Sequence, residues 1–178
     1  SHADRLWLVT DSNAPRHSLG RVLLDYRFDE GQHLQLLARR GGLAAAPPPS
    51  RLANGINLIG HSVGKIAPGL VQVTLYWYCG APPGQSYTVF TQLLDADGNF
   101  VAGHDGLPAA GNAPTHTWQT GSVYADTHSI ELPRDVPAGT YRVIAGMYDF
   151  NARRVLAGRP EGGQFENAAI PLGDLQLP

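Results

Sequence analysis

The run Tyr87-Thr-Val-Phe-Thr-Gln-Leu-Leu-Asp-Ala-Asp-Gly-Asn-Phe-Val-Ala-Gly-His104 decides the fold class of this 178-residue chain. It consists of two strand-like runs joined by Asp97-Gly98-Asn99. An Asp-Gly pair between apolar runs indicates a tight hairpin, because glycine accepts the positive φ that such turns require. The region is therefore predicted to form antiparallel sheet.

Further runs of strand formers, separated by glycine and proline, lie on both sides of this hairpin. Pro137-Ala138-Gly139-Thr140, for example, stops the chain before another such run. The candidate strands lie at residues 56–63, 71–78, 87–94, 100–104, 122–132, 141–148 and 168–177. Short strands at this spacing predict a mainly β protein with an antiparallel β-sandwich, and both the immunoglobulin-like and the jelly-roll topologies remain open.

The first part of the chain shows a different pattern. Residues 5–9 are an apolar strand candidate, and Ser18 is a candidate helix N-cap. Apolar side chains then follow at i, i+3, i+4 and i+7, which is helical spacing, at Leu19, Val22, Leu23 and Tyr26. Residues 33–39 can return as a second strand. These features predict a small β-α-β segment ahead of the sandwich.

The domain boundary is expected in the stretch Gly41-Gly-Leu-Ala-Ala-Ala-Pro-Pro-Pro-Ser50, which has linker composition. We therefore predict a β-α-β segment over residues 1–43, the tail of an upstream α/β region, followed by a proline-rich linker over 44–50. The β-sandwich domain is predicted over 51–178. The start Ser1-His2-Ala3 resembles a cleavage scar, so we expect the chain to be a piece of a longer protein.

Charge and cysteine content exclude several classes of function. The 13 basic and 15 acidic residues give a net charge of -2, which provides no field to attract nucleic acid. Cys79 is the single cysteine, so neither an intrachain disulfide nor a thiolate metal site is available. It follows Trp77-Tyr78, and we expect both Cys79 and Trp77 to be buried. The apolar runs are far shorter than the roughly 20 residues that cross a bilayer.

The candidate site lies in the long connection over residues 103–121 and the strand after it. Loops of this length in a compact domain are often functional. This part contains four polar or aromatic side chains in the loop and two on the strand, namely His104, Asp105, His116, Trp118, Asp126 and His128. Trp118 is the candidate for stacking on a sugar ring. The carboxylates are expected to pin the loop by accepting backbone N–H bonds.

Catalytic and metal patterns fit this sequence poorly. The His and Asp residues match no recognised metal-ligand spacing, so no metal ion and no cofactor is predicted. Gly60-His-Ser-Val-Gly64 has the spacing of a nucleophile elbow, but the turn residues after it replace the helix that such an elbow needs. No catalytic residue is therefore assigned. A metal-dependent hydrolase using the histidines stays as the least favoured alternative.

Five segments together resemble a known type of module, namely Phe90-Thr-Gln-Leu-Leu-Asp-Ala-Asp-Gly-Asn, His104-Asp-Gly-Leu-Pro, Pro114-Thr-His-Thr-Trp-Gln-Thr-Gly121, Asp126-Thr-His-Ser-Ile-Glu-Leu-Pro133 and Pro137-Ala-Gly-Thr-Tyr-Arg-Val-Ile-Ala-Gly-Met-Tyr-Asp149. They resemble the C-terminal soluble domain of bacterial multi-spanning membrane glycosyltransferases related to protein mannosyltransferases and aminoarabinose transferases. The resemblance implies an extracytoplasmic location, a partner in the membrane-embedded part of the parent protein, and catalysis in that part.

These observations favour a non-catalytic accessory domain that binds carbohydrate or a glycan acceptor through the loop. The alternative is a structural or protein-interaction sandwich without a ligand. An exposed apolar patch or a free sheet edge would favour that alternative, whereas a lined groove would favour ligand binding.

Overall fold

The computed structural model describes residues 5–11, 20–27, 32–39, 50–159 and 162–178. The chain divides into two compact units, Ser1–Pro47 and Pro48–Pro178. Apart from Ser50, the stretch predicted as a linker lies outside the described residues.

The first unit contains a three-stranded antiparallel sheet in the order β1-β3-β2, formed by β1 (Arg5–Asp11), β2 (Gly20–Arg27) and β3 (Gln32–Arg39). The helix predicted here is wrong, because its residues from 20 onward form β2 and pair with β3. A short apolar run fits helical and strand periods about equally well, and pairing with β3 favours the strand. The proposed N-cap Ser18 lies outside the described residues.

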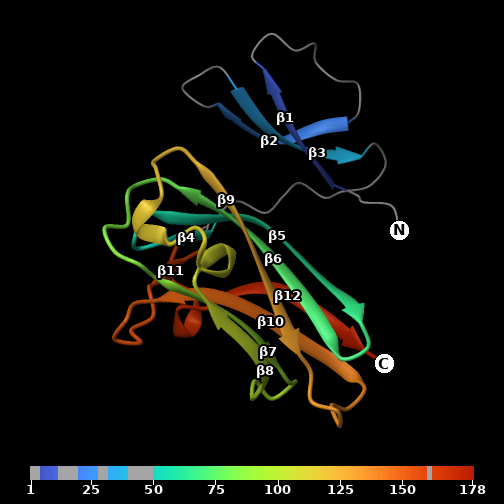
Figure 1. Cartoon of the computed structure of the whole chain (residues 1–178). Coiled ribbons are helices and arrows are strands. Elements are labelled where there is room, and N and C mark those ends of the chain that lie inside the picture. Colours follow the sequence, from blue (N-terminus) through green and yellow to red (C-terminus); the bar gives the residue numbers. More distant parts are fainter. Residues whose placement is uncertain (1–4, 12–19, 28–31, 40–49, 160–161) are drawn as a thin grey trace. The chain divides into compact units, whose positions relative to one another are not determined.

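The second unit is a β-sandwich of two antiparallel sheets (Figure 1). One sheet has four strands in the order β12 (Ile170–Leu177), β10 (Gly139–Tyr148), β7 (Thr88–Leu94) and β8 (Phe100–Gly106). The other has five in the order β11 (Ala157–Gly158), β4 (Ser50–Leu52), β5 (Ile56–Ala67), β6 (Leu70–Cys79) and β9 (Val123–Glu131).

The mainly β fold class and the sandwich predicted from the sequence are confirmed. Each of the seven strand candidates coincides with one of the longer strands, whereas the very short β4 and β11 were not predicted. The remaining described elements are short 3₁₀ turns, η1 (Pro108–Gly111), η2 (Thr115–Thr117) and η3 (Glu166–Ala168). In the described part of the chain, no helix has the length and apolar character needed to cross a bilayer.

The predicted hairpin is the β7–β8 connection. Gly98 has φ of 84°, and the Asp95 carboxylate accepts hydrogen bonds from the backbone N–H groups of Asp97 and Asn99 at 2.9 and 2.8 Å. The Asn99 side-chain amide also donates to this carboxylate at 3.0 Å, and this bond, followed by the backbone bonds, favours the charged form and lowers the pKa of Asp95. The turn is therefore fixed by its own local sequence, as expected for an Asp-Gly hairpin.

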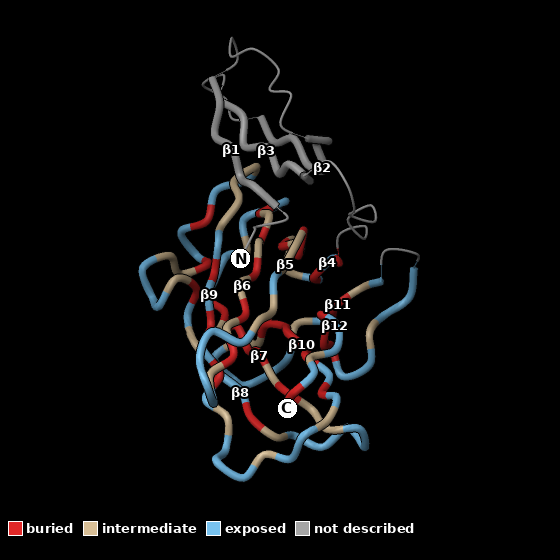
Figure 2. The backbone as a smooth tube through the Cα atoms, turned by 90° about the vertical axis from the view of Figure 1, so that its right-hand side faces the viewer, coloured by how far each residue is buried: buried red, intermediate tan, exposed pale blue. Residues whose placement is uncertain are grey.

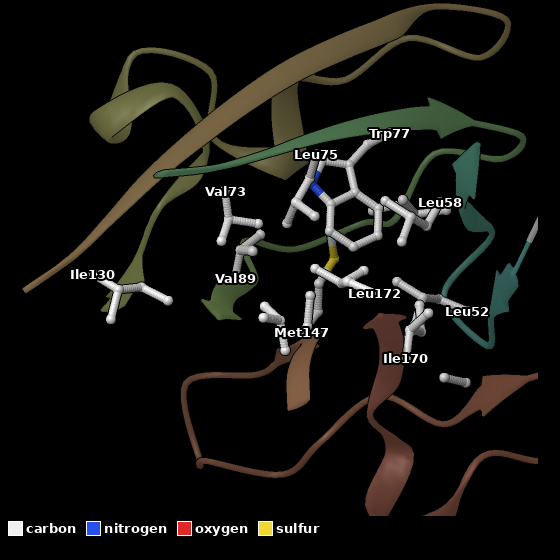
Figure 3. Close-up of a cluster of buried hydrophobic side chains, with 14 of the residues drawn as sticks. Leu52, Leu58, Val73, Leu75, Trp77, Val89, Ile130, Met147, Ile170 and Leu172 are labelled. Atoms are coloured by element: carbon white, nitrogen blue, oxygen red, sulfur yellow. The ribbon is translucent and has the colours of Figure 1, made fainter. Parts of the chain in front are cut away.

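The core lies between the two sheets. Along β6, alternate residues point inward and are fully buried, namely Val71, Val73, Leu75, Trp77 and Cys79. Figure 3 shows the Trp77 ring among Leu58, Leu75 and Leu172, so residues of both sheets pack on it. The predicted burial of Trp77 and Cys79 is confirmed, and burial raises the pKa of the Cys79 thiol.

The far face of the four-stranded sheet has a smaller apolar cluster. The Phe90 ring lies over Gly146, where an added Cβ atom would come within 2.5 Å of it. The Arg154 guanidinium lies over this ring at 4.4 Å from its centroid, and Phe90 stacks against Tyr148. Phe90 is consequently buried although it faces away from the core. In Figure 2, buried segments run through the strands, and exposed segments dominate the connections.

Candidate functional site

The candidate site forms where an edge strand of each sheet meets the other. β8 ends the four-stranded order and β9 ends the five-stranded order, and the two strands are in contact. Inward-pointing positions alternate along β9, so Asp126, His128 and Ile130 are all buried. Ile130 joins the apolar core, whereas the two polar side chains face β8 and the turn that follows it. Alternation in β9 thus places polar groups inside the sandwich edge.

Three side chains form a continuous hydrogen-bonded chain across this edge. His128 Nε2 lies 2.8 Å from Asp126 Oδ2, and His128 Nδ1 lies 2.8 Å from His104 Nδ1. Asp126 and His128 are each 1% exposed, whereas His104 is exposed to solvent. The imidazole rings are 5.0 Å apart in an edge-on arrangement. We call Asp126, His128 and His104 the polar seam.

Hydrogen-bond complementarity fixes the tautomers in the seam when both rings are neutral. A carboxylate only accepts, so His128 donates from Nε2 to Asp126. Its Nδ1 is then the acceptor, and His104 must donate from Nδ1. This leaves His104 Nε2 as an unprotonated acceptor on the exposed side of the seam.

The second carboxylate oxygen of Asp126 holds the turn beside the seam. Asp126 Oδ1 accepts the backbone N–H of Ala109 at 2.9 Å. Ala109 and the next residue, Ala110, both have φ of 53°, a left-handed conformation that is unfavourable for alanine. The prediction that Asp126 pins the loop through a backbone N–H is confirmed. Its buried bond offsets part of the strain in η1.

A hollow of about 420 Å³ opens beside the seam. Its lining comes from the end of β8, the η1 turn and the middle of β9. The lining residues are His104, Asp105, Gly106, Leu107, Ala110, Gly111, Asp126, Thr127, His128 and Ser129. Four of the six side chains singled out from the sequence therefore meet at one place.

Asp105 lies at the border of this hollow and also contacts the outer face of the four-stranded sheet. Tyr148 Oη donates a hydrogen bond of 3.0 Å to Asp105 Oδ2. The pKa of Tyr148 is raised. The largest cause is partial burial, and the hydrogen bond to Asp105 and the negative charge of that carboxylate add to it. Asp105 thus accepts from a side chain rather than from the backbone N–H that was expected. Its other oxygen has no protein donor within the described residues.

Trp118 does not line the hollow, which corrects the expectation that it stacks on a sugar. Its side chain is 3% exposed, and its ring is stacked on Tyr124 with centroids 4.3 Å apart and planes 5° apart. The indole Nε1–H donates to the Ala113 carbonyl at 2.8 Å. Loop position suggested exposure, but the loop folds back and buries the ring as part of the core.

His116 also lies apart from the seam. Its Nδ1 is 2.7 Å from the Ser86 hydroxyl, and the side chain is exposed. The neighbouring Thr115 is buried and links the loop to the start of β7, accepting from the Tyr87 N–H and donating to the Gln85 carbonyl. The second half of the loop therefore packs against the sandwich, and only its first half lines the hollow.

The geometry gives no support to the hydrolase alternatives. Within the described residues, no group of three or more His, Cys, Asp or Glu side chains is arranged to hold a metal ion. Gly60, Ser62 and Gly64 lie inside β5 and pair with β6, so they form no strand-to-helix elbow. The seam also has no hydroxyl nucleophile bonded to either histidine among the contacts described for it.

Two hydroxyl residues of the hollow, Thr127 and Ser129, were not predicted from the sequence. They alternate with Asp126 and His128 along β9 and are exposed. The signal that could have identified them is the polar, period-two composition of 126–129, which makes one short strand polar on both faces.

Comparisons with known proteins add little to this geometry. No family model matches the sequence, and no curated protein matches it. One solved structure with a similar arrangement is described as the crystal structure of the C-terminal domain of Wzt. It is 15% identical, covers 72% of this chain and 80% of that chain, and gives a TM-score of 0.44. A likeness this distant carries no argument about function.

Proposed function

We propose that the sandwich is a non-catalytic, carbohydrate-binding domain whose site is the hollow beside the polar seam. The observation that carries this proposal is the convergence of His104, Asp105, Asp126 and His128 on one hollow of about 420 Å³. That volume falls in the lower part of the range of about 300–1,000 Å³ that is typical of small-molecule sites. It suits a ligand of one or two sugar rings.

The chemistry of the lining favours a polyhydroxylated ligand. Sugar hydroxyls can donate, and the hollow offers acceptors for them. His104 Nε2 and the free oxygen of Asp105 are acceptors, whereas the side chains of Thr127 and Ser129 lie on the other face of β9, where the Thr127 hydroxyl contacts the Thr74 hydroxyl. The buried bonds of Asp126 and His128 hold His104 in place before any ligand arrives. Such preorganisation lowers the entropic cost of binding.

The setting of the domain rests on the sequence resemblance alone. We propose that it is the extracytoplasmic accessory domain of a membrane glycosyltransferase, which would present glycan or acceptor to a membrane-embedded catalytic part.

A glycan array probed with the whole chain tests the binding proposal. Glycans that bind the wild-type chain should lose most of their signal with His104→Ala, because that change removes the exposed imidazole without disturbing the bond between Asp126 and His128. His116→Ala is the matched control, since this histidine is exposed but lies outside the hollow. It should leave the signal unchanged.

Equal losses from both alanine variants, or binding that survives His104→Ala, would place any sugar site elsewhere. Absence of binding to every glycan on the array by a folded wild-type chain would remove the carbohydrate proposal and favour a structural domain.

A further inference from the structure

A second concave site lies at one end of the sandwich, in a different place from the hollow. It is a groove of about 660 Å³ between the β5–β6 turn, the β9–β10 connection and the end of β12. Figure 1 shows the β5–β6 turn and the C-terminal end of β12 at this same end. The Leu132 N–H donates to the Gly69 carbonyl at 2.8 Å, which ties the two connections together.

The walls of the groove are largely apolar. Leu177 is 2% exposed and belongs to the main core, and Leu132 and Val136 are half-buried and pack against that core. Ile66, near the end of β5, is 53% exposed and borders the groove. The groove thus offers an apolar surface continuous with the interior, and Ile66 would gain burial from any occupant.

Two cationic side chains border this apolar surface, and no acidic side chain lines it. Lys65 and Arg134 line the groove, whereas none of its lining residues is Asp or Glu. Both side chains are exposed, and neither forms an ion pair in the part of the chain that the structure describes. Lys65 is the single lysine in a chain of otherwise arginine cations. Two unpaired cations beside an apolar groove match a ligand with an anionic head and a hydrocarbon body.

We infer that this groove binds a single-chain amphiphile with a phosphate head, its alkyl chain against Leu132, Val136 and Leu177 and its head between Lys65 and Arg134. A phosphate monoester fits better than a neutral or cationic head, because it offers up to two negative charges to two cations. The volume is that of a site for one small molecule rather than an extended macromolecular interface. This inference does not depend on carbohydrate binding in the hollow.

Hydrogen bonds within the β9–β10 connection hold this wall of the groove in place. The Tyr141 hydroxyl donates to the Pro137 carbonyl at 2.8 Å, four residues earlier, and Tyr141 is buried at the start of β10. A tyrosine used in this way anchors the corner of a sandwich. The Val136 N–H also donates to the Pro133 carbonyl, so the segment that carries Arg134 is closed into a turn.

Calorimetric titration of the whole chain with decyl phosphate, kept below its micelle concentration, tests the inference. We expect saturable binding with one site, and about tenfold or greater weakening in the double variant Lys65→Met/Arg134→Met. Methionine keeps most of the hydrocarbon stem and removes the charge. Arg142→Met is the matched control, since Arg142 is an exposed cation on β10 outside the groove. It should bind decyl phosphate as the wild-type chain does.

Further titrations separate the head from the tail. Inorganic phosphate and decanol should each bind at least tenfold more weakly than decyl phosphate, and Ile66→Ser should weaken decyl phosphate several-fold. Thermal unfolding of each variant shows whether it remains folded. Equal affinity for decyl phosphate and decanol, an unchanged double variant, or binding only to phosphatidate vesicles and not to the monomeric probe would each overturn the inference.

Discussion

In the centre of the sandwich and in the polar seam at its edge, side chains alternate between the inside and the outside in the same way. The inward side chains are apolar in the centre and polar in the seam. At the centre, every inward position of β6 is apolar and Trp77 fills the space between the sheets. At the edge, two inward positions of β9 are Asp126 and His128, and they are as deeply buried as Trp77. Asp126 and His128 can be buried because each of their side-chain polar atoms has a hydrogen-bond partner, so burial alone does not distinguish a core position from a site position.

The two regions also differ in how completely their polar atoms are paired. In the seam, both oxygens of Asp126 and both nitrogens of His128 have hydrogen-bond partners. At the centre, the indole Nε1 of Trp77 is buried without a partner among the described atoms. We therefore expect the centre to depend on volume and the seam to depend on hydrogen bonding.

Trp77→Ala should cause the largest loss of stability. Removing a fully buried tryptophan leaves a large cavity, and such changes cost about 3–5 kcal/mol. Urea unfolding followed by circular dichroism measures the loss. Trp77→Phe is the control, because it keeps most of the volume and removes an N–H group that has no partner. A phenylalanine variant as unstable as the alanine variant would mean that the indole nitrogen matters and the central claim about volume is wrong.

Asp126→Ala should have the next largest effect, about 1–3 kcal/mol. It leaves the Ala109 N–H and His128 Nε2 without their acceptor in a buried setting, and it frees the strained η1 turn. The same urea experiment measures it. Asp126→Asn should be milder, since its amide oxygen can still accept one of the two bonds. If alanine and asparagine cost the same, hydrogen bonding does not hold the seam.

Asp105→Asn should change the pKa of Tyr148 more than it changes the stability of the domain. The carboxylate of Asp105 raises the pKa of Tyr148 after the larger contribution of burial. The asparagine variant should therefore lower the pKa of Tyr148 toward its ordinary value, which NMR of isotope-labelled tyrosine can follow. Asp174→Asn, on β12, is a control that should leave that pKa unchanged. An identical Tyr148 titration in Asp105→Asn would show that burial alone causes the shift.

The same group sets an alkaline limit on stability. Because the pKa of Tyr148 is raised in the folded state, its contribution is fully present below the ordinary tyrosine pKa of about 10. It is lost as the pH rises through the raised folded value. Comparing urea midpoints of the wild-type chain and Tyr148→Phe across this range tests the sign. As the pH rises through this range, the urea midpoint of the wild-type chain should fall relative to that of Tyr148→Phe, which has no group that titrates at this position.

The sandwich was predictable because its signals are local. Asp97-Gly98 fixes the β7–β8 hairpin by its own backbone conformation, and the alternation of β6 requires no knowledge of its neighbours. The strand β2 was not predictable in the same way. Its apolar residues suit helix and strand alike, and the pairing with β3 that selects the strand is a tertiary contact.

The sequence identified the residues of the candidate site, but it did not show which of them lie together in the structure. His104, Asp105, Asp126 and His128 were identified from loop length and composition, and they do line one hollow. Trp118 and His116 come from the same loop but lie elsewhere, because the loop turns back at η2 and packs Trp118 on Tyr124. Sequence proximity within a long loop does not show on which side of the loop a residue ends.

Amide NMR mapping during titration with a glycan selected on the array shows whether sugar binds in the hollow beside the polar seam. The largest shifts should fall on residues 104–111 and 126–129, around the hollow, and His104→Ala should remove them. Shifts concentrated on the far face of the four-stranded sheet or in the groove at the end of the sandwich, with 104–111 and 126–129 unchanged, would contradict binding in the hollow.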